Sequence, residues 1–433
     1  MNEQEKAVWL LRRKLLVLNR ELRHWKEVSR DAQTRFRTNH SQIRAFALIV
    51  HSFSSAIYLR TREPGFSQAD AYALTKDVLA LFRIWEFLRT RLAQRLEERF
   101  HKSLVVADEF AFACYQAAAA QLYKEPPLVF LNGGFSPFIL PRGREFQAEF
   151  VPNDLIQGEE LLDAMSRLPF PVIGVPWYQV ASAWELPVIA HEVGHSIEGD
   201  LGLSHELRAR VKAAVADASR MDVWKGWCSE AFADYYGCYA VGPSFVSNLG
   251  EFLTATGVTA GDRYPPASIR LELNFAFLGT EFATPGDGIP SPVPALRDRF
   301  SELLKVPAEF VPYKHDVAQV AESLRALDVK LPHFSAANYR NAYKLAARAL
   351  TESVHSVHDV REVAAALRIG YDASLGPNVN SPAKRREYLE RLRQLEDVLL
   401  ASGKPDIRAA ANETGWDRRK AAHLVRAKEW FPG

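Results

Sequence analysis

The segment from Leu186 to Ile197 sets two histidines and a glutamate inside an apolar stretch, and this feature restricts the fold more than any other. Its sequence is Leu-Pro-Val-Ile-Ala-His-Glu-Val-Gly-His-Ser-Ile. Apolar residues on both sides of the polar ones predict a buried helix, and Pro187 suits the first turn of that helix. Burying an imidazole or a carboxylate is costly unless the group is paired or bound to a metal ion. The fold must therefore supply partners for this helix in its interior.

The spacing of the two histidines favours a metal site. His191 and His195 are four residues apart, so on a helix they lie on one face about one turn apart. Two imidazoles so placed can bind one Zn²⁺ ion, which accepts neutral histidine nitrogens at about 2.0–2.1 Å. Glu192 follows the first histidine, where its carboxylate can take a proton from a water molecule on the metal. The alternative is a coincidental pair of histidines on an ordinary helix.

A catalytic zinc site also needs a third protein ligand and an open position. A third histidine six residues after the second is excluded because Leu201 stands there, and Asp200 falls where the helix is expected to end. The better candidate is Glu230, in the segment Trp-Cys-Ser-Glu-Ala-Phe-Ala-Asp-Tyr-Tyr-Gly, which is helical in pattern and apolar around its acids. Asp234, one turn later, is expected to orient a ligand histidine through its other ring nitrogen. The alternative is two acids on a solvated face.

His-Glu-x-x-His followed by Glu-x-x-Ala-Asp on a later helix resembles the gluzincin metallopeptidases. The local sequence is most similar to soluble relatives of the HtpX and CAAX-prenyl endopeptidase group, over about residues 165–282. Tyr264-Pro265-Pro266 with Arg270 is also similar to a His-Pro…Arg segment of that group, with tyrosine where histidine is usual. The resemblance implies a zincin-like catalytic core, a zinc cofactor and hydrolysis of a peptide or protein substrate.

The reaction so implied needs a general base and a group that stabilises the oxyanion. Glu192 is the predicted general base, which takes the proton of the attacking water and gives it to the leaving amine. The strand expected at 135–140 is a candidate for binding substrate backbone by edge addition, the alternative being an ordinary half-buried strand. Candidates for contact with the oxyanion or the substrate, which can equally serve packing or surface roles, are Tyr264, Arg270, Tyr313 and His315.

Composition places the chain among ordinary globular proteins. Of 433 residues, 48% are hydrophobic and 24% charged, and the net charge is +2, which excludes a strongly basic protein overall. Three cysteines do not make a disulfide framework and favour a reducing compartment. The polar N-terminal residues do not resemble a signal peptide, and no apolar run reaches the length of about 18 residues that a transmembrane helix needs. We therefore expect a cytoplasmic protein without membrane contact.

The chain reads as a mostly α protein with a small β-sheet, in three parts. Residues 1–102 predict an N-terminal bundle of long helices, in which Ser67 and Asp70 form a capping box. Residues 103–375 predict the zincin-like core. Within it, four short runs have β-type sequence, and they are Leu104–Ala107, Pro127–Leu131, Pro137–Leu140 and Phe170–Val175.

The remaining part, residues 383–433, predicts a small helical module after a linker rich in glycine and proline. Its sequence is compatible with a helix-turn-helix, with Arg418, Arg419 and Lys420 on the second helix, so DNA is a candidate partner. A helical cap with a solvated basic face is the alternative. Two other functions stay open: a DNA-binding regulator whose peptidase core cleaves a partner repressor, as in the ImmA type, and a non-catalytic scaffold stabilised by zinc.

Overall fold

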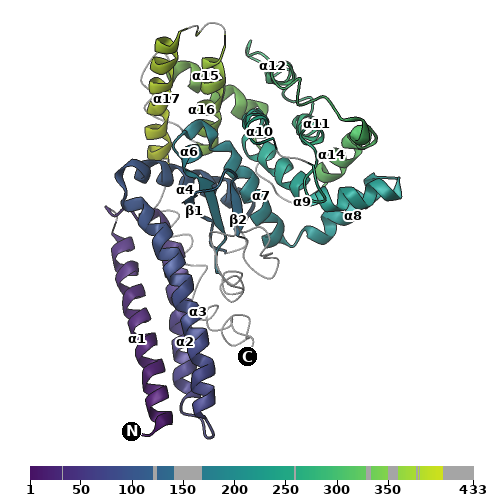
Figure 1. The fold of residues 1–433 in the computed structure, drawn as a ribbon. Helices are drawn as coiled ribbons and strands as arrows, with labels where there is room; N and C mark the ends of the chain where they lie inside the picture. The colour runs from purple at the N-terminus through teal and green to yellow at the C-terminus, as the bar shows by residue number, and fades with distance from the viewer. Residues whose placement is uncertain are drawn as a thin grey trace.

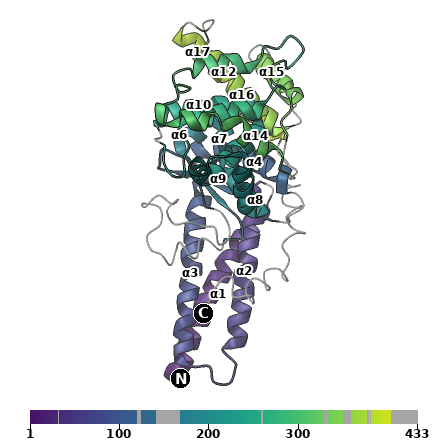
Figure 2. The same cartoon turned by 90° about the vertical axis from the view of Figure 1, so that its right-hand side faces the viewer.

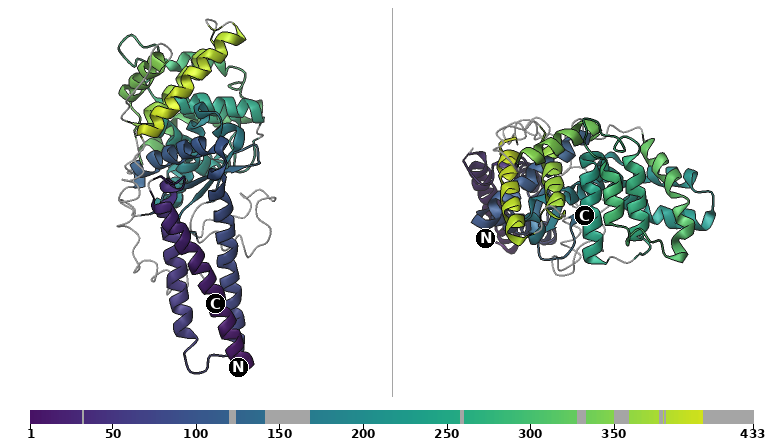
Figure 3. Two further views of the ribbon diagram at one scale, coloured as in Figure 1. Left: turned by 90° about the vertical axis from the view of Figure 1, so that its left-hand side faces the viewer. Right: turned by 90° about the horizontal axis from the view of Figure 1, so that it is seen from above.

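The fold is mostly helical with one small sheet in the part of the chain that the structure describes, which confirms the predicted class. The N-terminal helices form a long bundle that projects from a compact helical body, and the N-terminus lies at the far end of this bundle (Figure 1, Figure 3). The structure is a computed structural model, and it describes residues 1–31, 33–119, 124–140, 168–257, 260–327, 333–349, 359–376, 379 and 381–402.

Three helices build the bundle: α1 (Glu3–Arg30), α2 (His40–Arg60) and α3 (Gln68–Ala93), with a 3₁₀ turn, η1 (Arg37–Asn39), before α2. The leucines of α1 that recur at threes and fours are its buried face, and they are Leu11, Leu15, Leu18 and Leu22. The capping box at the start of α3 is confirmed, because the backbone N–H of Asp70 donates to the Ser67 hydroxyl and the Ser67 N–H donates back to the Asp70 carboxylate.

The chain leaves the bundle through η2 (Gln94–Leu96) and α4 (Glu98–Ala119), which enters the body. The expected β-type run Leu104–Ala107 is wrong, since it lies inside α4. Its apolar residues look strand-like because they are consecutive, but the buried face of α4 continues at helical spacing through Leu104, Ala107, Ala111 and Cys114. A short apolar run does not by itself distinguish a strand from a buried helix.

The sheet consists of β1 (Leu128–Asn132), β3 (Val172–Pro176) and β2 (Phe138–Leu140), in that spatial order. The three remaining β-type runs are thus confirmed. β3 is central: it pairs in parallel with β1 and antiparallel with β2. Gly174 of β3 has no side chain because the ring of Phe138 lies over it, 2.4 Å from where a Cβ would stand.

Both faces of the sheet are buried, and each belongs to a different core. Leu128, Phe130 and Val172 pack with the apolar residues of α1, α2 and α3. Val129, Ile173 and Val175 point to the other side and pack with α4 and with the helices of the body. Alternate residues of a strand face opposite sides, so the sheet joins the base of the bundle to the body.

The body is built from helices (Figure 2). Their apolar side chains form one large core. In chain order, its elements after β3 are α6 (Trp177–Val180), η4 (Ala183–Glu185), α7 (Pro187–Leu201), α8 (Ser204–Ala214), α9 (Ala218–Val241), α10 (Pro243–Thr256), α11 (Ala267–Leu278), α12 (Pro292–Arg299), η5 (Ala308–Phe310), α13 (Val311–Lys314), α14 (Val317–Arg325), α15 (Ala336–Ala349), α16 (Val360–Ser374) and α17 (Pro382–Ser402).

The last described helix, α17, packs on the body. Leu392, Leu395 and Leu399 are fully buried in the same core as α16, and Lys102 of α4 makes an ion pair with Asp397. The domain boundaries at 102 and 383 stay predictions, and the expected helix-turn-helix at 403–433 lies outside the described residues. Within the described part of the chain, no helix combines the length and apolarity that crossing a membrane requires.

Candidate metal centre

Two helices cross closely at the predicted motif. α7 begins with Pro187 in its first turn and ends at Gly202, whose φ of 68° closes the helix. α9 runs beside it, and Gly194 makes the close approach feasible. A Cβ at Gly194 would stand 3.0 Å from Ala233 Cα and 2.9 Å from Tyr236 Cβ, both on α9. Because Gly194, which lies between the two histidines, has no Cβ, the backbone of α9 can pack close to the middle of α7.

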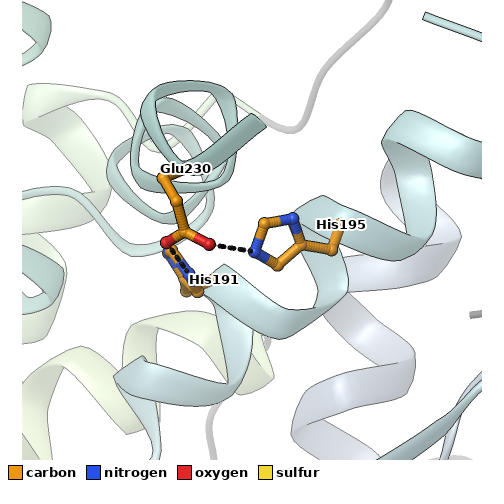
Figure 4. A group of neighbouring side chains, drawn as sticks. All are labelled: His191, His195 and Glu230. Carbon is orange, nitrogen blue, oxygen red and sulfur yellow. Dashed lines mark ion pairs between the residues drawn. The ribbon is translucent and has the colours of Figure 1, made fainter. Parts of the chain in front are cut away.

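The crossing brings His191, His195 and Glu230 together. One ligand atom from each residue lies within 4.8 Å of the others. Glu230 reaches both imidazoles from α9, with Oε2 3.3 Å from His191 Nε2 and Oε1 3.4 Å from His195 Nε2 (Figure 4). His191 and Glu230 are buried, and His195 is partly exposed. The structure thus assembles the three residues that the two motifs predicted as ligands.

A buried network of charged side chains contacts His191 at Nδ1, the ring nitrogen that does not face Glu230. This nitrogen lies 2.9 Å from Asp234 Oδ1. The Asp234 carboxylate also accepts two hydrogen bonds from Arg270, at 2.6 and 2.9 Å, and one from Asn274 at 3.3 Å. Because an ionised carboxylate only accepts, Nδ1 of His191 carries a hydrogen, and a neutral imidazole would then have its lone pair on Nε2, the nitrogen that faces Glu230. This is the position expected for Asp234.

His195 is held by a different set of groups. Its Nδ1 lies 3.2 Å from the hydroxyl oxygen of Ser229, the residue before Glu230. The Ser229 hydroxyl donates to Glu198 Oε2, and the other carboxylate oxygen of Glu198 accepts from the Ser204 hydroxyl at 2.9 Å. Nδ1 is thus engaged and Nε2 faces Glu230, as in His191.

Glu192 is buried on the same helix, and its charge interacts with those of His191, His195 and Glu230. Burial raises the pKa of Glu192 above its ordinary value, and the two histidines only partly oppose the rise. Burial also works against ionisation of Glu230, but the two imidazoles beside it outweigh burial and hold its pKa well below the ordinary range. The pKa values of these two neighbouring carboxyl groups are thereby shifted in opposite directions.

The donor set fits a zinc ion. Two imidazole nitrogens and one carboxylate oxygen are a recurrent ligand set of catalytic zinc. Glu230 Oε2 is buried and accepts no hydrogen bond from the described residues, although buried polar atoms are nearly always partnered. A cation between the three side chains would satisfy this atom together with the two Nε2 lone pairs.

Tyr264 lies at the edge of the centre. It belongs to the loop after α10, which approaches α9 where Gly226 has no side chain: a Cβ there would stand 2.2 Å from the Asp262 carbonyl oxygen. The indole N–H of Trp227 donates to the Gly261 carbonyl at 2.8 Å and fixes the same loop. Tyr264 is 38% exposed. Partial burial, followed by the charges of Glu230 and Glu192, raises the pKa of its phenol to about 12.

The other residues predicted to contact the oxyanion or the substrate have different surroundings. Arg270 is buried and donates to Asp234 through two nitrogens, with one of them 3.7 Å from Glu230 Oε2. The ring of Tyr313 packs on Trp227 at 5.1 Å between centroids, and His315 is exposed at the end of α13. A separate group of residues surrounds Asp200, which accepts from the Tyr115 hydroxyl and from Lys124.

Sequence reasoning missed Ser229, Glu198 and Asn274, which hold the centre together. Two of them carried a local signal: Glu198 is three residues after His195, one turn on, and Ser229 directly precedes Glu230. Asn274 is four residues after Arg270 and shares its face of α11. None belongs to a motif, and only the crossing of the helices shows which of them meet.

Comparisons with protein families, with curated proteins and with solved structures found no match for this chain. The resemblance to gluzincins therefore depends on the two motifs alone.

Proposed function

We propose that the chain is a zinc-dependent peptidase with its centre at His191, His195 and Glu230. The observation that carries the proposal is the convergence of three ligand atoms within 4.8 Å beside a buried glutamate that is not one of them. A purely structural zinc site has four protein ligands and no need of such a glutamate, whereas a catalytic site has three and an open position. Among the described residues the cluster has three.

His191, His195 and Glu230 would hold the zinc ion, which when bound would lower the pKa of a water molecule to about 7 and polarise a carbonyl group. Glu192 is placed to take the proton of that water, because it is adjacent to His191 on α7 and its charge interacts with both histidines. Its raised pKa suits a group that must first accept a proton and then release it to the leaving amine. Glu230 stays ionised and serves as a ligand, so the two carboxyl groups have separate roles.

Tyr264 is the best-placed candidate for the oxyanion. Its phenol is partly exposed, interacts with Glu230 and Glu192, and keeps its hydrogen at neutral pH because its pKa is raised to about 12. A neutral donor close to the reacting carbonyl can stabilise the charge that develops there. Arg270 has two of its nitrogens engaged with Asp234, and we assign it to positioning that residue.

The edge strand β2 is our candidate for binding the substrate backbone. It pairs with β3 on one side, and no described strand pairs with its other side. β2 also packs against α7, the helix that carries the histidines. An extended peptide added to this edge would run beside α7, with main-chain hydrogen bonds giving affinity and alternate side chains giving specificity.

Glu192→Gln tests the proposal, since the amide keeps the shape but cannot take the proton. The variant should bind one zinc ion like the wild type and lose hydrolysis of labelled casein or a quenched-peptide library by about 10²–10⁴-fold. Glu230→Ala should lose stoichiometric zinc, measured by metal analysis after dialysis. Zinc in the wild type without hydrolysis of any peptide would favour the zinc-stabilised scaffold. Equal turnover by Glu192→Gln would refute the role of Glu192.

A further inference from the structure

The contacts of the outer ring nitrogen, Nδ1, differ between His195 and His191, and at His195 they involve no residue of the two motifs. Asp234 contacts His191 directly, whereas the carboxylate nearest to His195 Nδ1, that of Glu198, is 3.9 Å away. Ser229 lies between them. Its hydroxyl oxygen is 3.2 Å from His195 Nδ1 and donates to Glu198 Oε2.

The direction of each hydrogen bond follows from the available hydrogens. Ser204 donates to one oxygen of Glu198 and Ser229 to the other, so Glu198 acts as an ionised acceptor. A serine hydroxyl has a single hydrogen. Because Ser229 gives this hydrogen to Glu198, its oxygen must accept from His195, and Nδ1 of His195 must carry a hydrogen. In the neutral form of His195 the lone pair is then on Nε2, the nitrogen that faces Glu230.

We infer that Ser229 and Glu198 are positioning residues that fix His195 in the tautomer able to bind the metal. The inference rests on the proposed zinc centre and deepens it. Hydrogen bonds to the outer nitrogen of a ligand histidine set its tautomer and ring orientation and increase its basicity. The residues involved come from α7, from the residue before Glu230 on α9, and, through Ser204, from the start of α8.

Removing Glu198 has a specific consequence under this arrangement. The Ser229 hydroxyl hydrogen is then free to donate to His195 Nδ1, which favours the tautomer with hydrogen on Nε2. A metal ion must displace that hydrogen before it can bind. Removing Ser229 instead leaves Nδ1 without an acceptor, because Glu198 Oε2 is 3.9 Å away. Either change should weaken metal binding by about 10–100-fold, as expected when an outer partner of a ligand is lost.

The test uses full-length protein and three variants: Ser229→Ala, Glu198→Ala and the double variant. Zinc affinity is measured by competition with a chromophoric chelator, and Co²⁺ is added separately to record its visible absorption spectrum, which reports ligand geometry. If Ser229 acts through Glu198, the two losses are not additive, and the double variant binds zinc about as weakly as the weaker single variant. Ser229→Thr keeps a hydroxyl and should restore affinity and spectrum.

Ser196→Ala is the matched control. Ser196 is adjacent to His195 on α7 and buried, but its hydroxyl has no hydrogen-bond partner among the described residues, so its loss should leave zinc affinity unchanged. Circular dichroism in EDTA shows whether each metal-free variant is folded. Additive losses, or wild-type affinity in Ser229→Ala, would overturn the inference while leaving the zinc centre intact. A wild-type protein that binds neither metal would instead overturn the proposed function itself.

Discussion

Replacing Gly194 by alanine should separate the metal ligands without touching any of them. Gly194 lies between the two histidines, where α7 and α9 are closest. The added Cβ would stand 3.0 Å from Ala233 Cα and 3.2 Å from the Ala233 carbonyl oxygen. Both atoms belong to the backbone of α9, so no flexible side chain can move aside to relieve the clash.

The displacement can be estimated from these distances. An ordinary contact begins at 3.4 Å, so moving Ala233 Cα out from 3.0 Å requires a separation of about 0.4 Å. Ligand-to-metal distances at a zinc site tolerate about 0.2 Å. The expected displacement of α9 is therefore about twice the change in ligand-to-metal distance that a zinc site tolerates. Glu230 would move with α9, because it belongs to that helix. Overpacking costs about 1–3 kcal/mol, against which alanine recovers up to about 1 kcal/mol of helix propensity.

We therefore expect Gly194→Ala to lose a modest amount of stability, at most about 3 kcal/mol, and to bind zinc at least about 10-fold more weakly. Urea unfolding in EDTA gives the stability, and chelator competition gives the zinc affinity. Gly370→Ala is the control, since its Cβ would clash with Leu392 on α17, away from the ligands. It should lose stability and keep zinc affinity. Wild-type zinc affinity in Gly194→Ala would refute the claim that this crossing sets the ligand geometry.

Three further predictions follow from named contacts. Asp234→Ala should weaken zinc binding by about 10–100-fold, whereas Asp200→Ala should leave zinc binding unchanged and cost about 1–3 kcal/mol of stability because the buried Tyr115 hydroxyl loses its acceptor; zinc titration and urea unfolding separate the two. Tyr264→Phe should keep zinc and reduce turnover more than KM, and unchanged kinetics would remove it from catalysis. Arg95→Met should cost about 3–5 kcal/mol in thermal unfolding because it leaves Asp108 as an unpaired charge, both residues being fully buried.

The cluster of candidate ligand residues was predictable because their spacing has a direct geometric meaning. Residues four apart on a helix share a face, so His191 and His195, like Glu230 and Asp234, were expected to act in pairs. The structure confirms that the pairs meet and that Asp234 contacts His191. Zinc itself and the hydrolytic reaction stay predictions, because no distance in the protein identifies a metal or a substrate.

Other features could not be predicted from the spacing of residues along the sequence. The run Leu104–Ala107 was expected to be a strand because it is short and apolar, and only its packing in α4 against the body shows it to be helical. The contact between Ser229 and Glu198 joins residues 31 positions apart. It exists because Gly194 lets α7 and α9 approach, so it is a consequence of tertiary packing that sequence spacing does not encode.

Two glycines on different helices allow other parts of the chain to pack close to the candidate metal centre. Gly194 of α7 allows α9, which contains Glu230, to pack closely. Gly226 of α9 allows the loop that contains Tyr264 to do the same. In the His-Pro…Arg segment that residues 264–270 resemble, histidine usually stands at the position of Tyr264. An ordinary histidine has a pKa of about 6.5 and changes its hydrogen count within the neutral range, whereas burial raises the pKa of Tyr264 to about 12. We therefore expect Tyr264 to stay a neutral donor across the neutral range, where a histidine would titrate.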